Sequence, residues 1–196
     1  VRRDDRDAKV PARTRAGNFE EASRATTELY FSCGVHEGDA SAVADRAKPQ
    51  KMERLKDVFA EAAATCRANG VDLIVAFVPA KFRVYHDLCR FDADSPCPAW
   101  PVDDLPAKVQ EAARSASPEV GFLDLTPALR DRAEAGELVY LPDDTHWSAH
   151  GHQAAAGAVA EMIGDRRRAV GDRLTSARSP EPGWPNGSTG RTRSDP

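Results

Sequence analysis

The sequence Tyr140-Leu-Pro-Asp-Asp-Thr-His-Trp-Ser-Ala-His-Gly-His152 is the most informative stretch of the chain. It contains two adjacent carboxylates and three of the five histidines. An apolar run, Leu138 to Leu141, leads into it and predicts a short strand. An alanine-rich stretch follows and predicts a helix, which Ser148 is placed to cap. Because open α/β sheets place their active sites between the carboxyl end of a strand and the next helix, this loop is the candidate active site.

Asp144 and His146 are the pair in this loop best suited to acid–base chemistry. An acid–base histidine needs a partner for its second ring nitrogen, which fixes the tautomer and stabilises the imidazolium. Residues two apart in an extended segment point to the same side, so Asp144 is placed to accept from His146. Asp143 is an alternative partner if the loop turns. The competing interpretation is a solvated Asp-Asp turn in which the histidine has no function.

Three stretches of the sequence stand out together: Asp144-Thr-His-Trp-Ser followed by Gly-His152, Leu73-Ile-Val-Ala-Phe-Val-Pro-Ala-Lys-Phe-Arg-Val-Tyr85, and Gly121-Phe-Leu-Asp-Leu-Thr-Pro127. They resemble the SGNH hydrolases, and most of all the branch that includes the alginate O-acetyltransferases. The resemblance covers about residues 50–165. It implies a Ser-His-Asp triad in which His146 is the general base and Asp144 orients it.

The sequence departs from that family at the nucleophile, which the family places in a Gly-Asp-Ser turn after a strand. The three Gly-Asp dipeptides of this chain begin at Gly38, Gly164 and Gly171, and none is followed by serine. Ser41 lies one residue too late and has no apolar run ahead of it. We therefore expect this chain to hold only the carboxyl half of an SGNH domain, with the serine outside it.

Three functions compete. The first is a serine ester hydrolase or O-acetyltransferase that acts on a carbohydrate or another acyl ester. The second is a non-catalytic carbohydrate-binding or scaffold remnant of that fold, in which Trp147 stacks on a sugar. The third is a metal site on His146 and His150, four residues apart, with His152 and Asp143 nearby. None of these motifs indicates a cofactor.

Lys81 is a further candidate for substrate binding, because it follows a predicted strand at its carboxyl end and could hold an anionic or sugar group. The alternative is that Lys81 shapes the loop. Cys89 and Cys97 bracket a seven-residue segment that a disulfide could close, and two free thiols are the alternative.

Composition excludes some classes of partner. A net charge of −4 gives no reason to expect binding to nucleic acid. No apolar run approaches the ~20 residues of a membrane span, and the charged first residues do not form a signal peptide. The family resemblance implies a periplasmic or extracellular location.

The pattern of apolar residues predicts an α/β fold with a short parallel sheet. The resemblance implies the three-layer sandwich of SGNH and flavodoxin-like proteins, which we expect to be incomplete in this chain. We expect a mostly disordered extension over 1–48, a partial domain over 49–170 with an exposed sheet edge, and a disordered tail over 171–196. The predicted strands are 71–78, 120–125 and 138–141, and the predicted helices are 49–69, 81–88, 104–116, 126–136 and 149–169.

Overall fold

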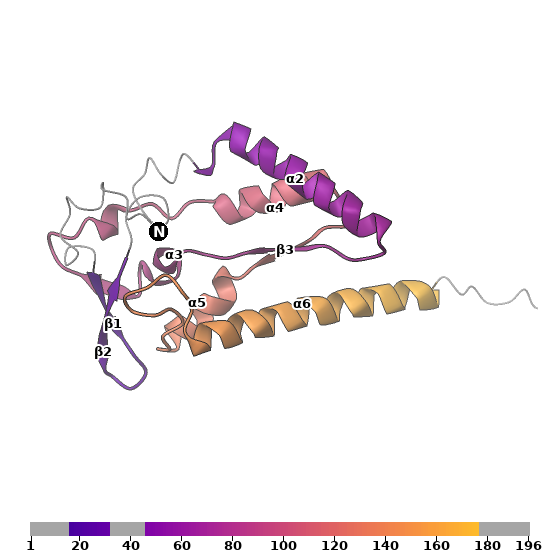
Figure 1. Cartoon of the computed structure of the whole chain (residues 1–196). Coiled ribbons are helices and arrows are strands. Elements are labelled where there is room, and N and C mark those ends of the chain that lie inside the picture. Colours follow the sequence, from indigo (N-terminus) through magenta and orange to yellow (C-terminus); the bar gives the residue numbers. More distant parts are fainter. Residues whose placement is uncertain (1–15, 32–45, 177–196) are drawn as a thin grey trace, which may run out of the picture. The chain divides into compact units, whose positions relative to one another are not determined.

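The computed structural model describes residues 16–31 and 46–176, which belong to two parts of the chain. The first part ends at Met162, and the described portion of the second is the carboxyl-terminal stretch of helix α6. Figure 1 follows the elements along the chain. None of the described helices combines the length and the hydropathy that crossing a bilayer requires.

Strands β3 (Ile74–Phe77) and β5 (Gly121–Asp124) form a parallel pair, in register from Ile74 opposite Gly121 to Phe77 opposite Asp124. Helices α2 (Pro49–Ala68) and α4 (Leu105–Ala116) lie against each other beside this sheet (Figure 1). A small core of Ala63, Ala113 and Val120 joins them. The predicted α/β class, with a parallel sheet, is confirmed.

The remaining predicted helices occur in the predicted order with shifted ends: α3 (Lys81–Tyr85), α5 (Thr126–Glu134) and α6 (Ala149–Ser176). A 3-10 turn, η3 (Cys97–Ala99), was not predicted and lies between α3 and α4. Helix α6 continues to Ser176, whereas we predicted its end at 169 and a disordered tail from 171. Residues 177–196 lie outside the described part. The missed residues, 170–176, contain only two large apolar residues, Val170 and Leu174, which are too few to show a helical period.

A second sheet corrects the prediction of a mostly disordered extension over 1–48. Strands β1 (Ala16–Glu20) and β2 (Thr26–Tyr30) form an antiparallel hairpin, and β4 (Cys89–Phe91) pairs with the other edge of β1. Phe19, Leu29 and Phe31 are buried in the main core. These strands are too short to show a clear alternation of apolar and polar residues, which is why the pattern did not predict them. Residues 1–15 and 32–45 lie outside the described part.

The predicted third parallel strand, Leu138 to Leu141, is the other correction. Its backbone joins no sheet, and Tyr140 instead forms a single antiparallel bridge with Trp147 farther along the chain. Val139 and Tyr140 are nevertheless fully or almost fully buried. The apolar run therefore marked a buried segment correctly, but burial alone does not distinguish a strand from an irregular segment.

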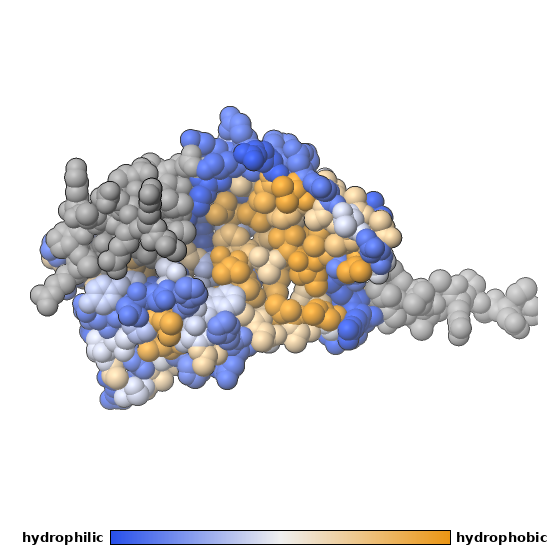
Figure 2. Space-filling view, viewed as in Figure 1, coloured by the Kyte–Doolittle hydropathy of each residue, from blue (hydrophilic) through white to orange (hydrophobic). Residues whose placement is uncertain are grey.

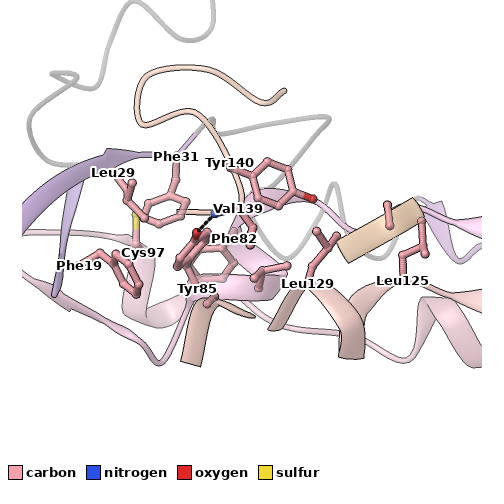
Figure 3. Close-up of a cluster of buried hydrophobic side chains, with 13 residues drawn as sticks. Phe19, Leu29, Phe31, Phe82, Tyr85, Cys97, Leu125, Leu129, Val139 and Tyr140 are labelled. Atoms are coloured by element: carbon pink, nitrogen blue, oxygen red, sulfur yellow. Dashed lines mark hydrogen bonds between the residues drawn. The ribbon is translucent and has the colours of Figure 1, made fainter. Parts of the chain in front are cut away.

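Aromatic side chains form the main core around this segment (Figure 3). The Tyr85 ring packs edge-on against Phe19 at 5.0 Å between centroids. Its hydroxyl accepts from the Val139 amide at 2.8 Å and donates to the Glu137 carbonyl at 3.3 Å. Burial raises the pKa of Tyr85 to about 12, so this hydroxyl keeps its proton. The Tyr140 hydroxyl donates to the Pro79 carbonyl at 2.6 Å. The core thus fixes the chain on its way into the candidate loop.

Apolar surface remains uncovered around β3, whose only pairing among the described strands is with β5. Val71 and Val78, which flank β3, are 58% and 57% exposed. Figure 2 shows apolar residues gathered on this face over β3 and next to α2. Helix α2 has an apolar stripe whose residues, three or four apart, are only partly buried: Met52, Leu55, Phe59, Ala62 and Cys66. Parallel strands are normally covered on both faces, which is not the case around β3. Because β3 has a strand on one edge only among the described residues, the structure also agrees with the expected exposed sheet edge.

Cys89 and Cys97 are both free thiols in the described part of the chain. Cys97 is fully buried, and burial raises the pKa of Cys89 to about 12. A thiol with so high a pKa stays protonated at neutral pH and is a poor nucleophile.

Two glycines of α6 provide a matched test of how tightly this helix is held. A Cβ at Gly151 would lie 2.0 Å from the Val139 carbonyl oxygen, whereas a Cβ at Gly157 would meet nothing within 4 Å. We expect Gly151→Ala to lower the free energy of unfolding by about 1–3 kcal/mol or more. Gly157→Ala should leave it unchanged or raise it by up to about 1 kcal/mol. Urea denaturation measures both, and equal midpoints for the two variants would contradict the packing described here.

Candidate active site

The loop between Tyr140 and Trp147 is closed by its own backbone. The Leu141 amide donates to the His146 carbonyl at 3.0 Å, and the Ser148 amide donates to the Val139 carbonyl at 3.0 Å. The Ser148 hydroxyl accepts from the Gly151 amide at 3.2 Å and donates to the Leu138 carbonyl. Ser148 therefore caps the first turn of α6, as the sequence predicted, and ties that turn to the start of the loop.

The Asp144 carboxylate is bonded to the His146 ring at the tip of this loop. Its Oδ1 lies 2.7 Å from Nδ1 of His146 and also accepts from the amides of Thr145 at 2.5 Å and His146 at 3.3 Å. An ionised carboxylate can only accept, so Nδ1 carries the proton and Nε2 of the neutral ring has a free lone pair. The His146 side chain is 80% exposed. The arrangement is that of a histidine oriented to take a proton from a group in solution.

The electrostatics of the pair agree with this geometry. The hydrogen bond from His146 is the largest of the effects that hold the pKa of the Asp144 carboxyl below its ordinary value, and the amides of Thr145 and His146 act in the same direction. The carboxylate is therefore ionised throughout the range in which a histidine titrates. It can stabilise an imidazolium when His146 accepts a proton.

The Lys81 ammonium faces inward beneath this loop, and the residue is only 1% exposed. Its Nζ donates to the carbonyls of Leu141 at 3.2 Å, Pro142 at 3.0 Å and Asp144 at 2.9 Å. This is the geometry expected of a lysine that shapes the loop. A substrate-binding lysine would present its ammonium to solvent.

The other polar residues of the stretch point to separate partners. His150 is paired with Glu137, with 3.1 Å between Nδ1 and Oε2, and the His152 ring packs edge-on against Trp147 at 5.5 Å between centroids. Trp147 is partly buried against the main core. Within residues 16–31 and 46–176, no group of three or more His, Cys, Asp and Glu side chains is arranged to hold a metal ion. The histidines that suggested a metal site in the sequence do not converge.

A cavity of about 390 Å³ opens at the carboxyl end of β3, next to the loop. Thr145, which lies between Asp144 and His146, is part of its wall, together with Phe77, Val78 and Val102. The sequence did not single out two further wall residues, Arg83 and Asp103, which form an ion pair. They are twenty positions apart, with β4 and η3 between them, so no spacing rule connects them.

Curated proteins similar to this chain share one description, "Probable alginate O-acetylase AlgJ". The protein of Pseudomonas putida (strain KT2440) is 35% identical over 108 residues, which are 55% of this chain and 26% of that protein. The protein of Pseudomonas fluorescens is 30% identical over 119 residues, 59% of this chain and 29% of that protein. The protein of Azotobacter vinelandii is 33% identical over 101 residues, 50% and 24% of the two chains.

The matching segments therefore span about a quarter of the length of these relatives. No solved structure matches the chain at comparable significance. The family described as "SGNH hydrolase-like domain, acetyltransferase AlgX" matches residues 37–186, which is well over half of the chain. This range includes the loop with Asp144 and His146, both strands of the parallel sheet and all the described helices. The chain therefore belongs to that SGNH hydrolase-like acetyltransferase family.

Proposed function

We propose that this chain supplies the acid–base half of a carbohydrate O-acetyltransferase or ester hydrolase site, with Asp144 and His146 in the roles of orienter and general base. The observation that supports this most is the 2.7 Å contact between Asp144 Oδ1 and His146 Nδ1, which leaves Nε2 directed away from the carboxylate. The nucleophilic serine belongs to polypeptide outside this chain, because no Gly-Asp-Ser turn occurs in it.

The proposed chemistry is acyl transfer through an acyl-enzyme. Nε2 of His146 takes the proton of the serine hydroxyl as the serine oxygen attacks the carbonyl carbon of an acetyl ester. The imidazolium then gives this proton to the departing alcohol oxygen, and an acetyl-serine remains. In the second half, His146 takes a proton from a sugar hydroxyl or from water, whose oxygen attacks the acetyl carbon, and returns it to the serine oxygen. Asp144 stabilises the imidazolium in both halves.

We infer a carbohydrate as the acceptor from the site and from its relatives. The curated relatives are described as acting on alginate, which is a statement about those proteins. The cavity beside Thr145 combines an aromatic and aliphatic wall with the Arg83–Asp103 ion pair. Ligand pockets commonly have volumes of roughly 300–1,000 Å³ with a few polar groups in an apolar wall. The volume of this cavity, about 390 Å³, lies within that range.

The absence of a Gly-Asp-Ser turn favours one alternative, a non-catalytic carbohydrate-binding or scaffold role. In that case His146 performs no proton transfer, and its substitution affects no acetyl transfer even when a serine is supplied. The two functions are therefore separated by the effect of His146→Ala and not by sugar binding.

We predict that the purified chain alone is nearly inert toward 4-nitrophenyl acetate. Triad members act as a unit, and loss of one costs on the order of 10⁶ in turnover in a well-studied serine protease. The rate should lie near that of His146→Ala, and a fluorophosphonate probe should label no serine, while a serine esterase treated in parallel is labelled. A robust rate that His146→Ala abolishes, together with a labelled serine, would place the nucleophile within this chain and overturn the proposal.

We also predict that the Asp144 carboxyl titrates below the ordinary aspartate value of about 3.9, as followed by ¹³C NMR. A lowered pKa means that the pair stabilises the folded loop above this ordinary value, and that this contribution is lost as pH falls through the folded pKa. His146→Ala should move the midpoint upward, because it removes the largest cause of the shift. His150→Ala, whose partner is Glu137, is the matched control and should leave the midpoint in place. An Asp144 midpoint that ignores His146→Ala would mean that the pair does not form in solution.

A further inference from the structure

We propose that Lys81 is the positioning residue of the acid–base pair: its buried ammonium sets the backbone from which the Asp144 carboxylate reaches His146. The proposal rests on the function proposed above and adds a residue that acts through another. Its basis is that the Asp144 carbonyl is one of the three acceptors of Nζ, at 2.9 Å, while the carboxylate of the same residue accepts from the His146 ring. One residue therefore joins the buried cation to the exposed histidine.

The three carbonyls under the loop need a cation to converge as they do. Those of Leu141, Pro142 and Asp144 all lie within 3.2 Å of Nζ. An ammonium has three donors and no acceptor, which matches three carbonyl oxygens. Without it, the three negative ends of the carbonyl dipoles would face one another, and the Asp144 carbonyl would lose the bond to Nζ, while the Leu141 and Pro142 carbonyls would keep one amide donor each, from Asp144 at 3.4 Å and Tyr30 at 2.8 Å. The loop would then have to rearrange where Asp144 leaves the backbone.

Lys81 is itself held from two directions. It is the first residue of α3, directly after Pro79 and Ala80, and Pro79 is bonded to the Tyr140 hydroxyl at 2.6 Å. Nζ lies 5.7 Å from the centroid of the Phe31 ring, within reach of a cation–π interaction. The Tyr30 amide donates to the Pro142 carbonyl at 2.8 Å, so β2 and Lys81 share this acceptor. The position of the ammonium is therefore set by contacts with the core as well as by the loop carbonyls.

The chemistry of this site is specific for lysine. An ammonium is a compact charge with donors arranged around one atom, whereas a guanidinium is planar and spreads its donors over a fork. A guanidinium cannot bring three donors to one point among three carbonyls. Lys81→Arg should therefore keep the charge and still fail to restore the position of Asp144.

A double-mutant cycle read by the ¹³C titration of the Asp144 carboxyl tests the proposal in the chain as it is, without substrate. Lys81→Met should shift the midpoint upward in the otherwise unsubstituted chain, because the bond to His146 is weakened. In the His146→Ala background, the same change should have little effect, since the bond is already absent. Lys81→Arg should behave like Lys81→Met. Val84→Ala, which changes a fully buried residue of the same helix, is the control for lost packing and should not move the midpoint.

Two results would overturn the proposal. An equal upward shift in both backgrounds would mean that Lys81 acts on Asp144 through its charge alone, and no shift in either would mean that the loop holds Asp144 without it. If circular dichroism shows that Lys81→Met does not fold, Lys81→Gln, which keeps an amide donor, takes its place in the same cycle with the same criteria. Acetyl-ester turnover is not measured here, so an inactive site would count against the proposed function and not against this role of Lys81.

Discussion

Three hydrogen bonds from one buried ammonium determine the shape of the loop on which this structure centres. Burial of a charge is costly unless its donors are satisfied, and the Lys81 ammonium has the carbonyls of Leu141, Pro142 and Asp144 within 3.2 Å. Hydrogen bonds from the surrounding elements hold the segments on both sides of this contact in place. The Tyr140 hydroxyl fixes the segment before Lys81, the Tyr85 hydroxyl fixes the entry to the loop, and Ser148 ties its exit to α6. The exposed Asp144–His146 pair is therefore carried by a loop that is hydrogen-bonded at its entry, its base and its exit.

Around β3 and α2, apolar side chains are less completely buried than around the Lys81 ammonium. Strand β3 is paired on one edge within the described residues, and the apolar stripe of α2 is only partly buried. Surfaces of this kind are normally found inside an α/β domain. The segments that match span about a quarter of the length of the curated relatives.

The sequence predicted those features that depend on local pattern. The i, i+2 spacing anticipated the bond between Asp144 and His146, and apolar periodicity anticipated α2, β3 and β5. The β1–β2 hairpin was missed because five-residue strands carry too few positions to show a period. The segment from Leu138 to Leu141 was given a strand that it does not form, since burial is visible in a sequence and hydrogen-bond partners are not. For the same reason, no pattern distinguished the inward role of Lys81 from a substrate-binding one.

The central claim, that His146 is the proton-transfer residue of an acetyltransferase site whose serine lies elsewhere, is tested most directly in a chimaera. Residues 37–186 of this chain, the segment that matches the family, would replace the corresponding segment of the Pseudomonas putida relative, and O-acetylation of alginate would be measured. We expect an active chimaera that loses roughly 10³-fold or more of its rate with His146→Ala and little with His150→Ala. An active chimaera in which His146→Ala acetylates as fast as the unsubstituted protein would contradict the account.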